Sequence, residues 1–213
     1  MIPAGRRRPG DRRRTPGAAP TALLVALALG AALAGCAGGA FDQSARSALT
    51  DRSAGDARPA VAGPVRSRPL SPGDAVPDFS APGLDGPRVG WSESRATPTV
   101  LIVWAPWCPH CRKELPLYAR IAVDFPAIRV LGVTTSIGRY GGPSPQDVAR
   151  SSGLAFPVAV DDEDNTVARA LGVYRYPTVY WVGPEGRVRA VTEGELGAEL
   201  IREGFDALAG LSR

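Results

Sequence analysis

Potential metal ligands are scarce in this chain of 213 residues, which contains three cysteines, one histidine and one methionine. A structural zinc site needs four protein ligands, usually two pairs of cysteine or histidine. Here His110 lies between Cys108 and Cys111, and the remaining cysteine, Cys36, lies far upstream. Because the sequence offers no second pair, we expect neither a metal site nor a cofactor.

Long hydrophobic runs are also lacking. The apolar stretch at residues 22–34 is shorter than the roughly 20 residues that a membrane-spanning helix needs. It follows arginine clusters at residues 6–8 and 12–14, a layout that is typical of a secretory signal peptide. The paired arginines also suggest twin-arginine export, although the rest of that signal is not matched.

A cysteine stands at the end of this leader. The segment Leu33-Ala34-Gly35-Cys36 resembles a bacterial lipobox, and the resemblance implies that Cys36 becomes the lipidated first residue of the mature protein. The alternatives are cleavage nearby with an incidental cysteine, or an uncleaved anchor. We therefore predict a signal peptide at residues 1–35 and an extracytoplasmic protein that is lipid-anchored to the bacterial cell membrane.

Excess basic charge is lacking once the leader is set aside. The net charge is +4, but residues 1–35 contribute six arginines and one aspartate. The rest of the chain has 19 basic and 20 acidic side chains, which is a net charge of −1. The basic character belongs to the leader, so nothing in the charge supports a nucleic-acid partner.

Large apolar residues are sparse at residues 36–70, where Ala, Gly, Ser, Pro, Arg and Asp dominate. Such a segment cannot bury enough surface to offset the entropy that is lost on ordering. We predict a disordered tether at residues 36–70. The remaining residues, 71–213, are numerous enough to form one globular domain with a single core.

What the chain does contain is Trp107-Cys108-Pro109-His110-Cys111, between a strand-like and a helix-like segment. A helix N-terminus stabilises negative charge, and the thiolate rather than the thiol is the reactive species. Cys108 lies where unpaired backbone N–H groups begin the helix, and Cys111 lies one turn later. This arrangement predicts a redox-active dithiol. Half of a zinc site and a purely structural disulfide are the alternatives.

Hydrophobic periodicity and turn residues predict the elements around this motif. We expect strands at residues 99–104, 128–134 and 157–160, a hairpin of strands at 178–182 and 187–191, and helices at 109–125 (kinked at Pro116), 146–152, 164–171 and 196–208. The strand–helix–strand order around the motif predicts a parallel right-handed crossover.

Residues from about 76 to 208 resemble the thioredoxin fold, and in particular the membrane-tethered TlpA/ResA-like (DsbE-like) thiol-disulfide oxidoreductases. The resemblance implies an α/β fold with a central mixed sheet flanked by helices and a family-specific insertion around the helix at 164–171. It also implies a protein-disulfide oxidoreductase with protein thiols and disulfides as substrates. The segments that carry it are Val76-Pro77-Asp78-Phe79, residues 104–116, residues 153–158, Leu171-Gly172-Val173 and Tyr176-Pro177-Thr178.

The two cysteines have different expected roles. We expect Cys108 to be the exposed attacking thiolate, and Cys111 to be the more buried thiol that resolves the mixed disulfide. His110 would favour the thiolate of Cys108, and Pro109-His110 resembles the pair in the oxidising DsbA proteins. The alternative for His110 is a solvated residue at a helix N-terminus.

Pro177, after Tyr176, resembles the cis-proline that faces the dithiol in thioredoxin-fold proteins. A cis bond there leaves backbone groups free to pair with an extended substrate segment, whereas an ordinary trans proline is the alternative. Together with Trp107 and Pro109 beside the cysteines, we expect Tyr176 and Pro177 to bind substrate.

Glu114 stands three residues after Cys111 and shares its helix face. ResA-like proteins carry a glutamate at this spacing, and the resemblance implies that it accepts a proton from Cys111 during exchange. An ordinary solvated glutamate is the alternative. Thioredoxin has a buried acid six residues before its first cysteine, but Ile102 stands there in this chain, so the usual proton relay is absent.

The direction of electron flow stays open. The resemblance implies a reductase, for example of apocytochrome c before haem attachment, with a membrane electron donor of the DsbD/CcdA type. His110 and an oxidising compartment instead favour oxidation of substrates, with an oxidising partner. Two other functions are considered. A peroxiredoxin-type thiol peroxidase needs a threonine and a proline at positions where this chain has Ala105 and Leu101. A non-enzymatic copper chaperone needs Cys-x-x-x-Cys and a distant histidine, and this chain has neither.

Overall fold

The computed structural model of this chain describes residues 58–211. The expected signal peptide, Cys36 and the first part of the expected tether lie outside these residues, so the statements about them stay predictions. Among the described residues, no helix is both long and apolar enough to cross a membrane.

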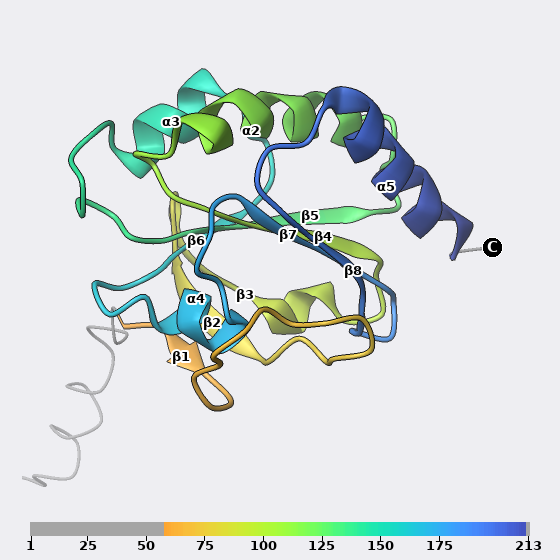
Figure 1. The fold of residues 1–213 in the computed structure, drawn as a ribbon, viewed down its shortest axis with the longest axis horizontal. Helices are drawn as coiled ribbons and strands as arrows, with labels where there is room; N and C mark the ends of the chain where they lie inside the picture. Colours follow the sequence, from red (N-terminus) through yellow and green to blue (C-terminus); the bar gives the residue numbers. More distant parts are fainter. Residues whose placement is uncertain (1–57, 212–213) are drawn as a thin grey trace, which may run out of the picture. The chain divides into compact units, whose positions relative to one another are not determined.

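One mixed sheet runs through the domain in the order β1-β2-β6-β5-β4-β7-β8, with β3 paired to β2 (Figure 1). β4 runs parallel to β5 and antiparallel to β7, and β5 runs parallel to β6. The predicted parallel pairing on either side of the first long helix is therefore confirmed. The strands are β1 (Ala60–Val61), β2 (Phe79–Gly83), β3 (Gly86–Gly90), β4 (Thr99–Trp104), β5 (Arg129–Thr134), β6 (Val158–Val160), β7 (Thr178–Val182) and β8 (Val188–Glu193).

Helices cover both faces of this sheet (Figure 1). On one face lie α2 (Pro109–Ala122), α3 (Pro145–Ser151) and α5 (Ala198–Gly210), and on the other lie the short 3-10 helix η1 (Trp91–Ser94) and α4 (Thr166–Leu171). All six side chains of β4 are buried, as its apolar sequence predicted. The expected α/β architecture, with a central mixed sheet flanked by helices, is confirmed.

The central strand contributes to two separate cores, because successive strand residues point to opposite faces. Ile102 and Trp104 pack toward α2 and α5 with Leu115 and Phe205. Leu101 and Val103 pack on the opposite face with Leu70, Trp91 and Leu171. The end of this strand is thus held rigidly from both sides, directly before the cysteine motif.

The domain begins earlier than its predicted boundary at residue 71. β1 pairs with β2, the Arg66 amide donates to the carbonyl oxygen of Arg169 at 3.0 Å, and Leu70 is fully buried. The Tyr174 hydroxyl also donates to the Arg66 carbonyl oxygen. The prediction of a disordered tether is therefore wrong for residues 60–70. One buried leucine and main-chain hydrogen bonds hold a segment whose composition is otherwise polar.

The sequence patterns missed β2 and β3, because Pro82 and Pro87 with their neighbouring glycines suggest turns rather than strands, and they also missed η1. The ends of α2 and α5 also differ from prediction by two or three residues. α4 is followed by Gly172 in a left-handed conformation with φ 74°, a common helix ending that glycine adopts without strain. The kink at Pro116 and the assignment of α4 to a family insertion stay predictions.

Candidate active site

The dithiol lies where β4 ends and α2 begins. Cys108 is the N-cap of α2, and Pro109 follows at a position where the N–H that proline lacks would be unpaired anyway. The backbone N–H of Cys111 donates to the Cys108 sulfur, with an N···S distance of 3.3 Å. Both cysteines are free thiols. The local sequence therefore places one sulfur against the amide groups of a helix N-terminus.

The two thiols have opposite electrostatic environments. The pKa of Cys108 is lowered to about 6, chiefly by a hydrogen bond with the Cys111 side chain and less by backbone amides and the charge of His110. Burial raises the pKa of Cys111, which is fully buried. Cys108 is only 4% exposed, so the prediction of an exposed sulfur is wrong. Its access to solvent is through a groove that it lines.

The loop before β7 closes over the reactive sulfur. The Tyr176–Pro177 peptide bond is cis, as predicted. The Cys108 thiol donates to the carbonyl oxygen of Tyr176, with an S···O distance of 3.6 Å. The Trp107 ring meets the Tyr176 ring edge-on, with centroids 5.8 Å apart. Trp107, Pro109 and Tyr176 thus line one groove with Cys108, whereas Pro177 is buried behind it.

Glu114 lies on the inner side of α2 and is 1% exposed, which excludes the solvated alternative. Its Oε1 accepts a hydrogen bond from the Tyr118 hydroxyl at 3.0 Å, while its buried Oε2 has no hydrogen-bond partner. Burial is the main cause that raises the pKa of Glu114 to about 7, and the charge of Cys108 adds to the rise. The carboxyl therefore changes its protonation near neutrality and interacts electrostatically with the dithiol.

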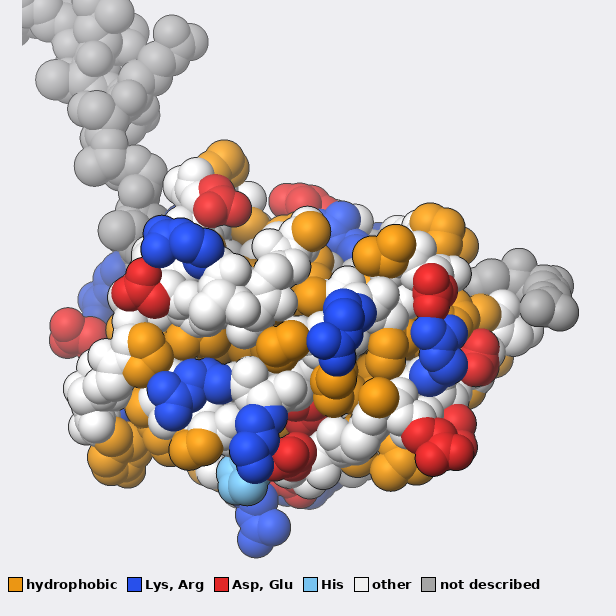
Figure 2. Space-filling view, turned by 90° about the horizontal axis from the view of Figure 1, so that it is seen from above, with side chains coloured by type: hydrophobic (Ala, Val, Ile, Leu, Met, Phe, Trp, Pro, Cys, Tyr) orange, Lys and Arg blue, Asp and Glu red, His pale blue; other side chains and the backbone are white. Residues whose placement is uncertain are grey.

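His110 is exposed in the first turn of α2 and pairs with a residue that the sequence did not reveal. Its Nδ1 lies 2.5 Å from Oε2 of Glu195, and the same oxygen lies 3.7 Å from Nζ of Lys113. The hydrogen bond with His110 lowers the pKa of Glu195. The chain's single histidine is visible at the surface in Figure 2, in pale blue. It is solvated, as the alternative supposed, yet its charge still helps to lower the pKa of Cys108.

A groove of about 660 Å³ opens beside the dithiol. One side of it is organised by Ser136, which has a left-handed backbone with φ 53°. The carbonyl oxygen of Ser136 accepts the indole N–H of Trp107 at 3.0 Å, and its hydroxyl lies 3.0 Å from the Tyr176 hydroxyl. The side-chain oxygen of Asn165 accepts from both the amide and the hydroxyl of Ser136. These bonds tie the cysteine motif to the loop that contains the cis-proline.

Sequence reasoning missed Tyr118, Glu195, Ser136 and Asn165. Tyr118 stands four residues after Glu114, so helical spacing carried a signal that could have revealed it. The other three lie between 29 and 85 residues from their partners along the chain, and no local pattern brings such residues together.

Comparisons with known proteins agree with this geometry. The AhpC/TSA family model matches residues 72–191. The chain is 29% identical over 134 residues to the thiol-disulfide oxidoreductase ResA of Bacillus subtilis, and the matched region covers 63% of this chain and 74% of that protein. It is 31% identical over 130 residues to the thiol:disulfide interchange protein DsbE of Allochromatium vinosum, covering 60% and 70% of the two chains. The solved structure of DsbF from Mycobacterium tuberculosis is 30% identical with a TM-score of 0.55, covering 61% and 94%.

Proposed function

The chain belongs to the AhpC/TSA family and is a thiol-disulfide oxidoreductase of the ResA/DsbE type, and we propose that Cys108 and Cys111 are its redox pair. The observation that carries this assignment is the asymmetry of the two sulfurs. One lies at a helix N-terminus and lines a groove with its pKa lowered to about 6, while the other is fully buried with its pKa raised. A nucleophile and a resolving thiol require this difference.

In the reducing direction, the Cys108 thiolate attacks one sulfur of a substrate disulfide. The bond between Cys108 and the substrate forms as the substrate's own S–S bond breaks, and the leaving sulfur takes up a proton. Cys111 then loses its proton, attacks the Cys108 sulfur and releases the second substrate thiolate. Two electrons pass to the substrate, and a Cys108–Cys111 disulfide remains. Oxidation of a substrate dithiol is the same sequence in reverse.

Glu114 is the group that would accept the Cys111 proton. It interacts electrostatically with both thiols, its pKa is raised to about 7, and its Oε2 is buried without a partner. A carboxyl with a pKa near the working pH is suited to proton transfer in either direction. Since the fully buried Ile102 stands where thioredoxin has an acid, that position supplies no second carboxyl to the dithiol.

Trapping of the mixed disulfide tests the assignment. With a disulfide-bonded protein such as insulin, Cys111→Ser should accumulate a covalent complex through Cys108, because the resolving thiol is missing. Cys108→Ser should accumulate none at the same concentration. Equal trapping by the two variants would contradict the assigned roles.

The direction of electron flow is a finer proposal. A stabilised Cys108 thiolate stabilises the reduced protein and makes its disulfide a better oxidant, which supports oxidation of substrates. The resemblance to TlpA/ResA-like proteins supports reduction, including reduction of apocytochrome c with a DsbD/CcdA-type partner. Equilibration with glutathione separates the two, because an oxidase of the DsbA kind has a potential of about −120 mV and thioredoxin one of about −270 mV.

The location is proposed from the leader. Lipidation of Cys36 would hold the domain at the membrane outside the cytoplasm, in a compartment where disulfide exchange takes place. Mass spectrometry of the mature N-terminus checks the modification, and Cys36→Ala should release the protein from the membrane fraction. Unchanged membrane retention of that variant would contradict the lipid anchor.

A thiol peroxidase is the alternative that the family name brings forward, and the site does not support it. The positions at which peroxiredoxins need threonine and proline hold Ala105 and Leu101, and both are fully buried. Neither side chain can donate a hydrogen bond to a peroxide. Disulfide exchange therefore remains the function that the geometry supports best.

A further inference from the structure

A positively charged groove leads to the reactive sulfur. Arg139 from the loop after β5, Arg169 from α4 and Arg175 from the loop before β7 all line it. Among the described residues that line this groove, Glu193 is the one acidic side chain. The described part of the chain, residues 58–211, has 16 basic and 17 acidic side chains, a net charge of −1. The positive charge at the groove is therefore a local concentration rather than a property of the whole domain.

The three guanidinium groups make no hydrogen bond or ion pair within residues 58–211. Over α2, α3 and α5, by contrast, acidic and basic side chains are interspersed (Figure 2). Arginines elsewhere in the domain have carboxylate partners, for example Arg66 with Asp74, Arg129 with Glu93 and Arg202 with Asp124. Guanidinium groups without partners, gathered from three segments, are free to bind carboxylates, which they match in a bidentate geometry.

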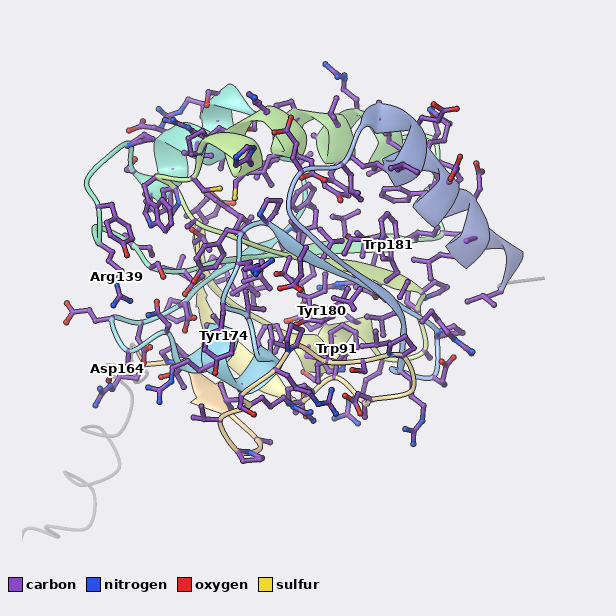
Figure 3. The ribbon with its side chains drawn as sticks, viewed as in Figure 1. Trp91, Arg139, Asp164, Tyr174, Tyr180 and Trp181 are labelled. Carbon is purple, nitrogen blue, oxygen red and sulfur yellow. The ribbon has the colours of Figure 1, made fainter. Side chains whose placement is uncertain are left out.

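Aromatic side chains complete the groove. The Trp107 ring meets the Tyr140 ring edge-on with centroids 4.7 Å apart, and Tyr140 and Tyr174 are 69% and 55% exposed. Figure 3 shows Arg139 and Tyr174 on the side of the domain where the two sulfur atoms lie, in yellow. Tyr, Trp and Arg are enriched at surfaces that bind polypeptide, and here two exposed tyrosines and three arginines lie beside the half-buried Trp107.

We propose that this groove selects substrates whose reacting cysteine lies in an acidic, extended polypeptide segment. The inference rests on the proposed redox function and adds a substrate class to it. Because Cys108 is 4% exposed and lines this groove, a substrate sulfur must approach along it. A Cys108 thiolate repels an acidic segment, and the three arginines offset that repulsion and steer the segment to the sulfur.

A polypeptide fits this site better than a membrane surface does. The charge lies within a groove that is also lined by Cys108, Trp107 and Tyr176, so a ligand held by the arginines lies beside the reacting sulfur, where a polypeptide cysteine is needed. The Tyr176 carbonyl oxygen, 3.6 Å from the Cys108 sulfur, also offers a main-chain acceptor to a segment that lies beside the sulfur.

The test uses short synthetic peptides with a central cysteine blocked as a mixed disulfide with 2-mercaptoethanol. The flanking residues are Glu, Gln or Lys in otherwise identical peptides. The Cys108 thiolate attacks the peptide sulfur and releases 2-mercaptoethanol as the blocking S–S bond breaks; Cys111 then releases the peptide thiol and leaves the protein disulfide. We expect the Glu peptide to react at least about tenfold faster than the Lys peptide at low salt, and the ratio to fall toward one at about 0.5 M salt.

Matched variants assign the preference to the groove. In the groove variant, Arg139, Arg169 and Arg175 are all replaced by Gln. The reaction rates of the Glu peptide and the Lys peptide should then differ by no more than about twofold. The control removes the same amount of charge elsewhere. Its three replacements by Gln are at exposed arginines that do not line the groove, Arg120, Arg150 and Arg202. It should keep the wild-type ratio.

Each contrary result has a separate meaning. If no peptide reacts with the wild-type protein, the proposed redox function fails. If the Gln peptide reacts but the wild-type ratio is near one, or if the ratio survives in the groove variant, the function stands and this inference is overturned. Loss of binding to vesicles of anionic lipid in the groove variant, with a wild-type peptide ratio near one, would assign the arginines to a membrane instead.

Discussion

The carboxyl of Glu114 offers a direct physical test of the buried side of the dithiol. Because burial raises its pKa from a usual 4.5 to about 7, the folded protein holds a proton at this group more tightly than the unfolded chain does. The stability that this difference contributes is fully present below about pH 4.5 and is lost as the pH rises through about 7.

The magnitude follows from the shift. One pKa unit corresponds to 1.36 kcal/mol, so a rise from 4.5 to about 7 is worth ~3 kcal/mol for a group that is 1% exposed. Glu114→Gln keeps an acceptor for Tyr118 and cannot ionise. Its free energy of unfolding, minus that of the parent protein, should therefore increase by about 3 kcal/mol between about pH 4 and pH 8. Both proteins should carry Cys108→Ser, so that this thiol does not titrate.

Urea unfolding followed by tryptophan fluorescence measures this difference across the pH range. Tyr118→Phe is the matched variant: it removes the hydrogen bond that lowers the pKa of Glu114, so the loss of stability should move to higher pH. A difference between Glu114→Gln and its parent that stays constant within about 0.5 kcal/mol would refute the reasoning, because Glu114 would then ionise as a solvated carboxylate does.

Three further outcomes are expected. Iodoacetamide should label Cys108 before Cys111 at neutral pH, and the labelling rate of Cys108 should reach half of its maximum at about pH 6. Peptide mapping that finds Cys111 labelled first would reverse their roles. His110→Pro should lower the reduction potential by about 6–20 mV, since an exposed charged contact is worth about 0.3–1 kcal/mol and 30 mV corresponds to 1.4 kcal/mol; an unchanged glutathione equilibrium would leave His110 without a redox role. Asn165→Gly keeps the left-handed backbone but removes the acceptor for Ser136, so urea unfolding should show a loss of about 1–3 kcal/mol, and no loss would contradict the importance of that turn.

The centre of the site could be predicted from sequence because its signals are local. The apolar run of β4 and the cysteine spacing after it place two sulfurs on the first turn of α2 without any knowledge of the rest of the fold. The orientation of Glu114 toward the dithiol follows from the same helical spacing. Pro177 required the family resemblance, since a proline alone does not reveal which residue it will face.

The surroundings of the site could not be predicted in this way. Glu195 reaches His110 across 85 residues of sequence, and Ser136 reaches Trp107 across 29, so these contacts depend on how the strands are ordered in the sheet. Composition was misleading at residues 60–70, where a few backbone hydrogen bonds and one buried leucine outweigh a polar sequence. The burial of Cys108 was missed because the loop that covers it lies 68 residues away.

The two sides of the dithiol therefore have separate tasks. On the side of α2, a buried carboxyl without a full set of hydrogen bonds is placed to move protons, and Ile102 adds no second acid to that face. On the side of the groove, aromatic rings and arginines control which segment reaches a sulfur that is nearly closed to solvent. Because a substrate must pass the groove before either sulfur reacts, selection precedes chemistry. Changes to the groove should then alter which substrates react, whereas changes to Glu114 should alter how the rate depends on pH.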